Sequence, residues 1–136
     1  MSQENVALVQ AIYAAFGTGD VPGVVSRMSP DIVWNEAENF PYADRNPYLG
    51  PEAILTGVFA RLGTEWDGFA AIPDEYLDAG DAVIVAGRYH GTYPATGRAL
   101  DAQFVHVWRI EDGKAVAFQQ YTDTLQAARV MERRVG

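Results

Sequence analysis

The chain has 136 residues, of which 49% are hydrophobic and 21% are charged, so it has enough apolar material for the core of one domain over 1–136. It contains no cysteine, which excludes disulfides, thiolate zinc sites and cysteine nucleophiles. The formal net charge is −8 and Lys114 is the one lysine, so we expect neither nucleic acid nor an anionic membrane as a partner.

Residues 1–5 lack the basic and apolar segments of a signal peptide, and no apolar run reaches the roughly 18 residues of a membrane span, so we expect a cytoplasmic protein.

The N-terminal part of the chain has a helical pattern. Apolar residues recur every three or four positions from Val6 to Phe16. This spacing predicts an amphipathic helix that begins near Ser2 and ends at Gly17.

A short helix, a strand and a long loop are expected next. Asp20 is a suitable cap for a helix that has Pro22 in its first turn and that Pro30 is expected to end. The residues that follow predict a strand over 31–36. The loop over 37–50 is longer than most connections, which is typical of a functional segment.

The rest of the chain predicts a third helix, a meander of strands and a last helix. Helical spacing returns from Pro51 to Leu62. The meander has four strands, at 69–77, 82–93, 98–110 and 114–122. Pro73 interrupts the first of these strands, so we expect it to be an edge strand or a bulged one. Asp123 can cap a helix from 124 to about 134. Helices first and strands later indicate an α+β fold with an antiparallel sheet.

Three polar side chains fall on otherwise apolar strand faces: Glu36, His106 and Gln120. Aromatic residues share those faces, namely Trp34, Phe104, Trp108 and Phe118. A buried carboxyl group without a partner has a raised pKa, and an imidazole titrates near neutrality. Glu36 and His106 together are therefore typical of an acid–base pair in a cavity.

Each polar residue also has a plainer interpretation. Glu36 lies at a strand end, where a solvated carboxylate is common, and His106 is compatible with a core histidine bonded to a backbone carbonyl. Asp123 is explained as a helix cap, and His90 as a surface histidine. Glu36, Glu38 and His106 lack metal-ligand spacing, so we expect no metal and no other cofactor.

The order of the elements resembles the nuclear-transport-factor-two-like (NTF2-like) cone fold, and within it the SnoaL-like and ketosteroid-isomerase-related proteins. The segments that carry the resemblance are 12–20, 29–34, 50–54, 79–81, 104–108, 112–114 and 121–124. The resemblance implies a cone-shaped, curved antiparallel sheet wrapped around N-terminal helices and enclosing an apolar pocket. It also implies a homodimer that pairs through the outer face of the sheet. The Asp–Arg–Asp set of limonene-epoxide hydrolases is replaced by Gly87, Tyr89 and Gln120, so that chemistry is not expected.

The resemblance implies roles for several residues. Ketosteroid isomerases remove a proton with an Asp at the end of the first strand and bind the enolate oxygen with an acid on the penultimate strand. Glu36 and His106 match these two positions. The oxyanion-binding Tyr falls at Ile12, beside Tyr13, which departs from the pattern of the steroid enzymes. SnoaL-type polyketide cyclases use a His and an Asp, for which His106 and Asp123 are the nearest candidates.

Three functions stay open at the level of sequence. One is a cofactor-independent isomerase or cyclase in which Glu36 removes a proton alpha to a carbonyl and His106 stabilises the enolate. The second is a module that binds a small hydrophobic molecule without chemistry. The third is a dimeric interaction module. In the first two cases the small molecule is expected to contact Tyr13, Trp34, Phe104, Trp108, Phe118 and Gln120.

Overall fold

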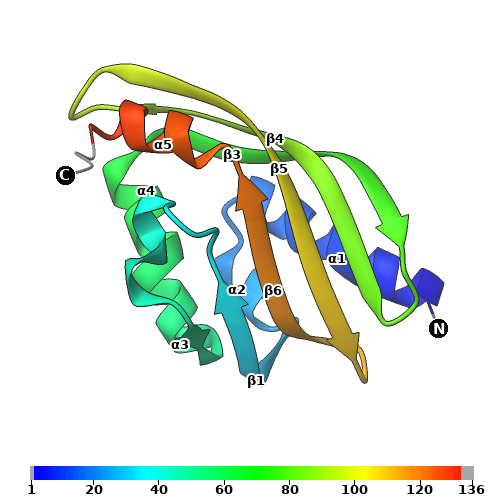
Figure 1. The fold of residues 1–136 in the computed structure, drawn as a ribbon. Helices are drawn as coiled ribbons and strands as arrows, with labels where there is room; N and C mark the ends of the chain where they lie inside the picture. Colours follow the sequence, from blue (N-terminus) through cyan, green and yellow to red (C-terminus); the bar gives the residue numbers. More distant parts are fainter. Residues whose placement is uncertain (1, 133–136) are drawn as a thin grey trace.

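The computed structural model describes residues 2–132, in which six strands form one curved sheet in the order β2-β1-β6-β5-β4-β3 (Figure 1). The strands are β1 Met28–Asn35, β2 Tyr48–Leu49, β3 Asp67–Asp78, β4 Ala82–Tyr93, β5 Arg98–Glu111 and β6 Lys114–Thr122. The helices are α1 Ser2–Gly17, α2 Val21–Val25, α3 Gly50–Ile54, α4 Ala60–Glu65 and α5 Thr124–Val130. A 3₁₀ helix, η1, spans Pro41–Arg45, and a π-helical segment, η2, spans Leu55–Phe59. The expected α+β class with a curved sheet is confirmed.

The predicted meander is present as β3 to β6, paired in sequence order. Burial alternates along most of β5, which places one of its faces in the core. Asp112 and Gly113 both have positive φ and form the tight turn between β5 and β6. Strand β3 lies at the sheet edge, and its pairing with β4 shifts between Pro73 and Glu75. The prediction of an edge strand with a bulge is therefore confirmed.

The first strand differs from the prediction in its start and in its direction of pairing. It begins at Met28 and continues through Pro30, which was expected to end the preceding helix. Its pairing with β6 is irregular between Met28 and Val33, so Pro30 lies where no regular ladder bond is needed. Strands β1 and β6 run parallel, whereas the other four strand pairs are antiparallel, as expected.

The segment 37–50, expected as a loop, contains two short elements, η1 and β2. Tyr42 in η1 and Tyr48 in β2 are buried. The helix expected from Pro51 to Leu62 is present as α3, η2 and α4 in succession. The last helix ends at Val130, and the final residues of its predicted range, 133 and 134, lie outside the described part of the chain.

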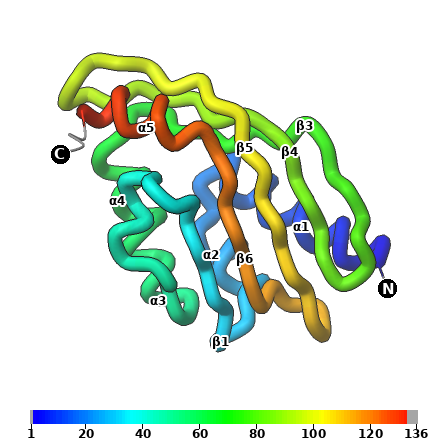
Figure 2. Tube along the Cα trace, viewed as in Figure 1, coloured from blue at the N-terminus to red at the C-terminus, as the bar shows by residue number. Residues whose placement is uncertain are grey.

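The helices close the sheet from its two edges. Helix α1 packs across β3 and β4, whereas α3 packs on β1 (Figure 2). Helix α5 lies against β5. Among residues 2–132, no helix is long and apolar enough to cross a membrane. The inner face of the sheet therefore faces a space bounded by α1 on one side and by the α3–η2–α4 segment on the other.

Candidate functional site

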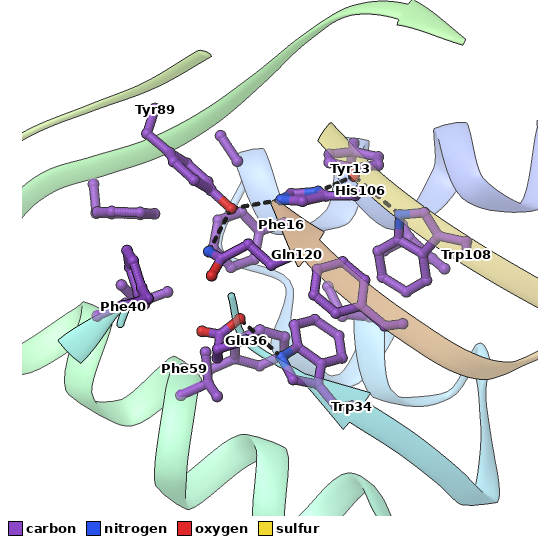
Figure 3. Close-up of a pocket in the computed structure, with 17 residues that line it drawn as sticks. Tyr13, Phe16, Trp34, Glu36, Phe40, Phe59, Tyr89, His106, Trp108 and Gln120 are labelled. Carbon is purple, nitrogen blue, oxygen red and sulfur yellow. Dashed lines mark hydrogen bonds between the residues drawn. The ribbon is translucent and has the colours of Figure 1, made fainter. Parts of the chain in front are cut away.

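A small cavity of about 50 Å³ lies inside the curve of the sheet, and its wall is mostly aromatic (Figure 3). Three polar side chains reach it: Glu36, His106 and Gln120. Their exposed fractions are 3%, 5% and 3%. The strand-face analysis therefore identified the three buried polar residues correctly, and the interpretation of Glu36 as a solvated carboxylate is wrong.

His106 is held between two tyrosines. The Tyr13 hydroxyl contacts Nδ1 of the ring, and the Tyr89 hydroxyl lies 2.5 Å from Nε2. Tyr13 accepts a hydrogen bond from Trp108 Nε1 at 3.0 Å, and Tyr89 accepts one from Gln120 Nε2 at 2.9 Å. Both ring nitrogens of His106 are thus occupied by tyrosine hydroxyls rather than by a backbone carbonyl.

His106, Tyr13 and Tyr89 together carry one more hydrogen than their two mutual contacts use. A neutral imidazole carries one N–H, and each tyrosine carries one O–H, so three hydrogens serve two N···O contacts. If Nε2 of His106 carries the ring hydrogen, it donates to Tyr89, and the Tyr89 hydroxyl hydrogen is left over. If Nδ1 carries it, the Tyr13 hydrogen is left over instead. In either tautomer, one hydroxyl remains free to donate to an added acceptor.

Burial lowers the pKa of His106 to about 3, because the charged ring would lie in an apolar environment. The ring is therefore neutral at physiological pH. The expectation that His106 titrates near neutrality is wrong, because the ring is buried so deeply that its charged form loses its hydration. Desolvation also raises the pKa of Tyr13 and of Tyr89 above the usual value. Both hydroxyls therefore keep their hydrogens. One donates to the unprotonated nitrogen of His106, and the other is available to donate to an added acceptor.

The Glu36 carboxyl lies on the other side of the cavity. Oε2 accepts a hydrogen bond from Trp34 Nε1 at 3.2 Å. The Glu36 backbone is fixed by Asn46, whose side chain accepts from the Glu36 N–H at 3.0 Å and donates to its carbonyl at 2.8 Å. Burial raises the pKa of the carboxyl to about 8, and the Trp34 hydrogen bond and the charge of Arg61 oppose this rise. Glu36 is therefore mostly protonated at pH 7.

Gln120 connects the two sides of the cavity wall. Its Oε1 accepts from the Ala37 N–H at 3.0 Å, beside Glu36, while its amide nitrogen donates to Tyr89. These two contacts define which amide atom is oxygen, since one partner is a donor and the other accepts. Gln120 thus joins the end of β1 to the hydroxyl of Tyr89.

The aromatic residues expected to bind substrate have two kinds of position. Four of them line the cavity: Tyr13, Trp34, Trp108 and Phe118. Phe104 does not line it, and stacks on His106 with a ring-centroid distance of 4.0 Å. Phe104 therefore supports the imidazole from behind, and a direct contact with a ligand is not expected.

Tyr89 and several aromatic wall residues were not predicted. Tyr89 lies on the inner face of β4 and lines the cavity, two positions after Gly87, which pairs with Phe104 of the neighbouring strand β5. The alternation of β4 was sufficient to find Tyr89, because the neighbouring His90 was correctly expected at the surface, where it lies near Asp101. Other wall residues come from helices and the 37–50 segment, where no strand pattern applies: Phe16, Phe40 and Phe59. Phe69 also lines the cavity, from the start of β3.

Asp123 is a helix cap. Its side chain accepts a hydrogen bond from the Gln126 N–H at 3.1 Å, and it does not line the cavity. Among the described residues, no group of three His, Cys, Asp or Glu side chains is placed to hold a metal ion. The polar side chains that line the cavity are the Glu36 carboxyl, the Gln120 amide, the His106 ring and the hydroxyls of Tyr13 and Tyr89.

The chain belongs to the SnoaL-like domain family, whose model matches residues 9–118. An NTF2-like protein from Burkholderia thailandensis E264 is 42% identical, with a TM-score of 0.88 over 93% of this chain and 95% of that one. An NTF2-like protein of unknown function from Burkholderia pseudomallei K96243 is 30% identical, with a TM-score of 0.85 over 93% and 96%. TerC, co-crystallised with polyporic acid, is 31% identical, with a TM-score of 0.85 over 95% and 98%.

No curated protein matches the chain. Two structures that are 17% identical share the fold: a hypothetical protein with a ketosteroid isomerase-like fold from Catenulispora acidiphila, with a TM-score of 0.76, and a putative SnoaL-like polyketide cyclase from Jannaschia sp. CCS1, with a TM-score of 0.82. The recognition made from the order of the elements is therefore confirmed at the level of family and fold.

Proposed function

We propose that the protein acts on a small, largely apolar carbonyl compound, moving a proton from the carbon next to the carbonyl to another carbon without a cofactor. The Glu36 carboxyl carries this proposal, because it is buried in an aromatic cavity and is hydrogen-bonded by one neutral donor, Trp34 Nε1. Among residues 2–132, no ion pair includes Glu36. A carboxylate formed there is a stronger base than one in water.

In the proposed reaction, Glu36 takes a proton from the alpha carbon, and the C–H electron pair moves into the carbonyl to form an enolate. The enolate oxygen accepts a hydrogen bond from whichever of the Tyr89 and Tyr13 hydroxyls does not donate to His106. Where the substrate carries a β,γ C=C bond, this enolate is a dienolate: protonated Glu36 gives the proton to its gamma carbon, the C=C bond moves to the α,β position and the carbonyl re-forms. No oxidant, reductant or water is consumed. His106 acts through the two tyrosines, so it is a positioning residue in this scheme.

The raised pKa of Glu36 predicts how this reaction depends on pH. With a pKa of about 8, roughly one carboxyl in ten is ionised at pH 7. The rate is therefore expected to rise with pH up to about 8 and to level off above it. The neutral His106 is not expected to add a second inflection near pH 6.5.

A second candidate function is binding without chemistry. The relative TerC was co-crystallised with polyporic acid, which supports a small-molecule ligand for this fold. In that case Glu36, Gln120 and the free tyrosine hydroxyl orient the ligand, and the aromatic wall supplies the apolar contact.

Deuterium exchange at the alpha carbons of cyclopentanone and cyclohexanone in D₂O, followed by NMR, separates the two functions. For the enzyme, Glu36→Gln lowers the exchange rate at least about 100-fold. Glu38→Gln is the matched control, since Glu38 is exposed two residues away. Equal exchange with wild type and Glu36→Gln would reject the proton transfer. Binding of polyporic acid in calorimetry without any exchange would favour the second function.

A further inference from the structure

The inner cavity is too small for a typical ligand. Its volume of about 50 Å³ has room for a few water molecules, or for a carbonyl group with a few carbons. Pockets for small molecules usually measure roughly 300–1,000 Å³. The cavity beside Glu36 therefore accounts for the reacting end of a ligand and not for its body.

A second cavity, of about 290 Å³, lies against the first. It is formed by the end of α1, by α2, by η2 and α4, and by the start of β3. Five apolar residues line both cavities and form the wall between them: Phe16, Val24, Phe59, Leu62 and Phe69. Together the two cavities reach the lower end of the usual range of ligand pockets.

Phe16 and Phe59 form the middle of this wall. Phe16 is in the last turns of α1, and Phe59 is the last residue of η2. Their ring centroids are 5.5 Å apart, at an interplanar angle of 57°. Both rings are only half-buried in the protein core. Since phenylalanine rings carry no polar group, turning them aside breaks no hydrogen bond.

We infer that the two cavities form one ligand site, in which a carbonyl head lies beside Glu36 and an apolar tail passes between Phe16 and Phe59 into the outer cavity. This inference rests on the proposed function for the head group alone. It assigns the ligand class as an elongated molecule with one carbonyl end and an apolar tail. The volumes of the two cavities correspond to a tail of more than about four carbons.

A series of 2-alkanones from butanone to decanone tests this assignment by calorimetry. For wild type, the affinity is expected to rise about fourfold with each added methylene until the outer cavity is filled. Gly63→Phe is designed to fill the outer cavity from α4, where a Cβ at residue 63 meets no atom within 4 Å. In this variant the affinity is expected to stop rising after about the first four carbons. Ala60→Phe is the control and is expected to behave as wild type, since Ala60 is exposed on the same helix and lines neither cavity.

Val21→Phe repeats the test from the opposite wall of the outer cavity, in case Gly63→Phe does not fold. An equal rise with chain length in wild type and in both Phe variants would overturn the inference, as would a wild-type affinity that does not depend on chain length. Glu36→Gln separates this site from the reaction, because it is expected to lose exchange but keep the dependence on chain length. Chain-length dependence without exchange would reject the reaction and support the site.

Discussion

Tyr89 connects two polar groups of the site, since its hydroxyl contacts His106 and Gln120, and it lines the same cavity as Glu36. Tyr89→Phe removes one of the two possible donors to the enolate oxygen. We expect exchange at the ketone alpha carbon to fall about 100-fold, which is the usual effect of losing one such donor. NMR-detected exchange, as for Glu36→Gln, measures this fall.

The same substitution leaves one nitrogen of His106 and one N–H of Gln120 without a partner, so a loss of about 1–3 kcal/mol in unfolding free energy is expected as well. Tyr121→Phe is the control, because Tyr121 is exposed on the outer face of the sheet. Unchanged exchange in a folded Tyr89→Phe protein would assign the donor to Tyr13 alone.

At the scale of the elements, the π-helical segment η2 and the 37–50 segment support the site together. Gly57 of η2 packs on the ring of Tyr48, and a Cβ at residue 57 would lie 2.3 Å from Cε2 of that ring. Tyr48 donates to the Tyr42 carbonyl and accepts from Arg61, which also pairs with Asp44 at 2.8 Å. This packing holds the segment that carries Asn46 and hence the Glu36 backbone.

Gly57→Ala is therefore expected to reduce the unfolding free energy by about 1–3 kcal/mol, because the methyl group overlaps a buried ring. Gly63→Ala in α4 is the matched control, since its Cβ meets nothing within 4 Å. It is expected to leave stability unchanged or to raise it by about 1 kcal/mol, through helix propensity. Urea unfolding measures both, and equal stability of the two variants would contradict the role given to the Tyr48 contact.

Strand alternation explains why part of the site could be predicted from sequence. In a strand, every second residue shares a face, so Trp34 with Glu36 and Phe118 with Gln120 were assigned to the core side without coordinates. The same rule does not show that Tyr13 meets His106, 93 positions later in the chain. That contact depends on how α1 packs across the sheet.

Other features could not be predicted because they depend on several elements at once. The parallel pairing of β1 with β6 joins segments about 85 residues apart. Phe59 lies within the helical repeat of 51–62, but that repeat does not show that its ring lines a cavity, and Phe40 directly precedes η1 in the segment that was expected to be a loop. The low pKa of His106 follows from its complete burial between two tyrosines and Phe104, and sequence alone does not give the depth of burial.

At the scale of the whole molecule, Glu36 and His106 predict the pH dependence of stability. Between about pH 4.5 and 6.5, Glu36 is protonated only in the folded state and His106 is protonated only in the unfolded state. The two states therefore bind the same number of protons, and the free energy of unfolding does not change with pH. From pH 6.5 to about 8 only the folded state holds a proton, so stability falls as pH rises, by about 1.4 kcal/mol per pH unit.

From pH 4.5 down to about 3 the unfolded state holds one more proton than the folded state, so stability falls as pH falls. We therefore expect a plateau in unfolding free energy between pH 4.5 and 6.5, measured by urea titration. Glu36→Gln is expected to remove the decline above pH 6.5, whereas Glu38→Gln retains it. A decline of equal size in Glu36→Gln would assign it to other groups.

The outer face of the sheet is proposed as the contact between two copies of the chain. Val105 and Tyr121 are cross-strand partners on this face, with exposed fractions of 37% and 56%. A homodimer is expected in sedimentation equilibrium at micromolar concentration, and Val105→Asp is expected to shift it to monomer. Leu125→Asp, at an exposed position on α5, is the control and should remain a dimer. A wild-type monomer would reject this contact.

The central claim is that the Glu36 carboxyl is buried in an aromatic cavity and forms no ion pair with any of residues 2–132. Carbon-13 NMR of glutamate-labelled protein, with the Glu36 signal assigned by its absence in Glu36→Gln, measures the titration of that carboxyl directly. The account predicts a midpoint at about pH 8. A midpoint near the ordinary value of 4.5 would show a hydrated or paired carboxylate, and would contradict both the geometry of the site and the proposed reaction.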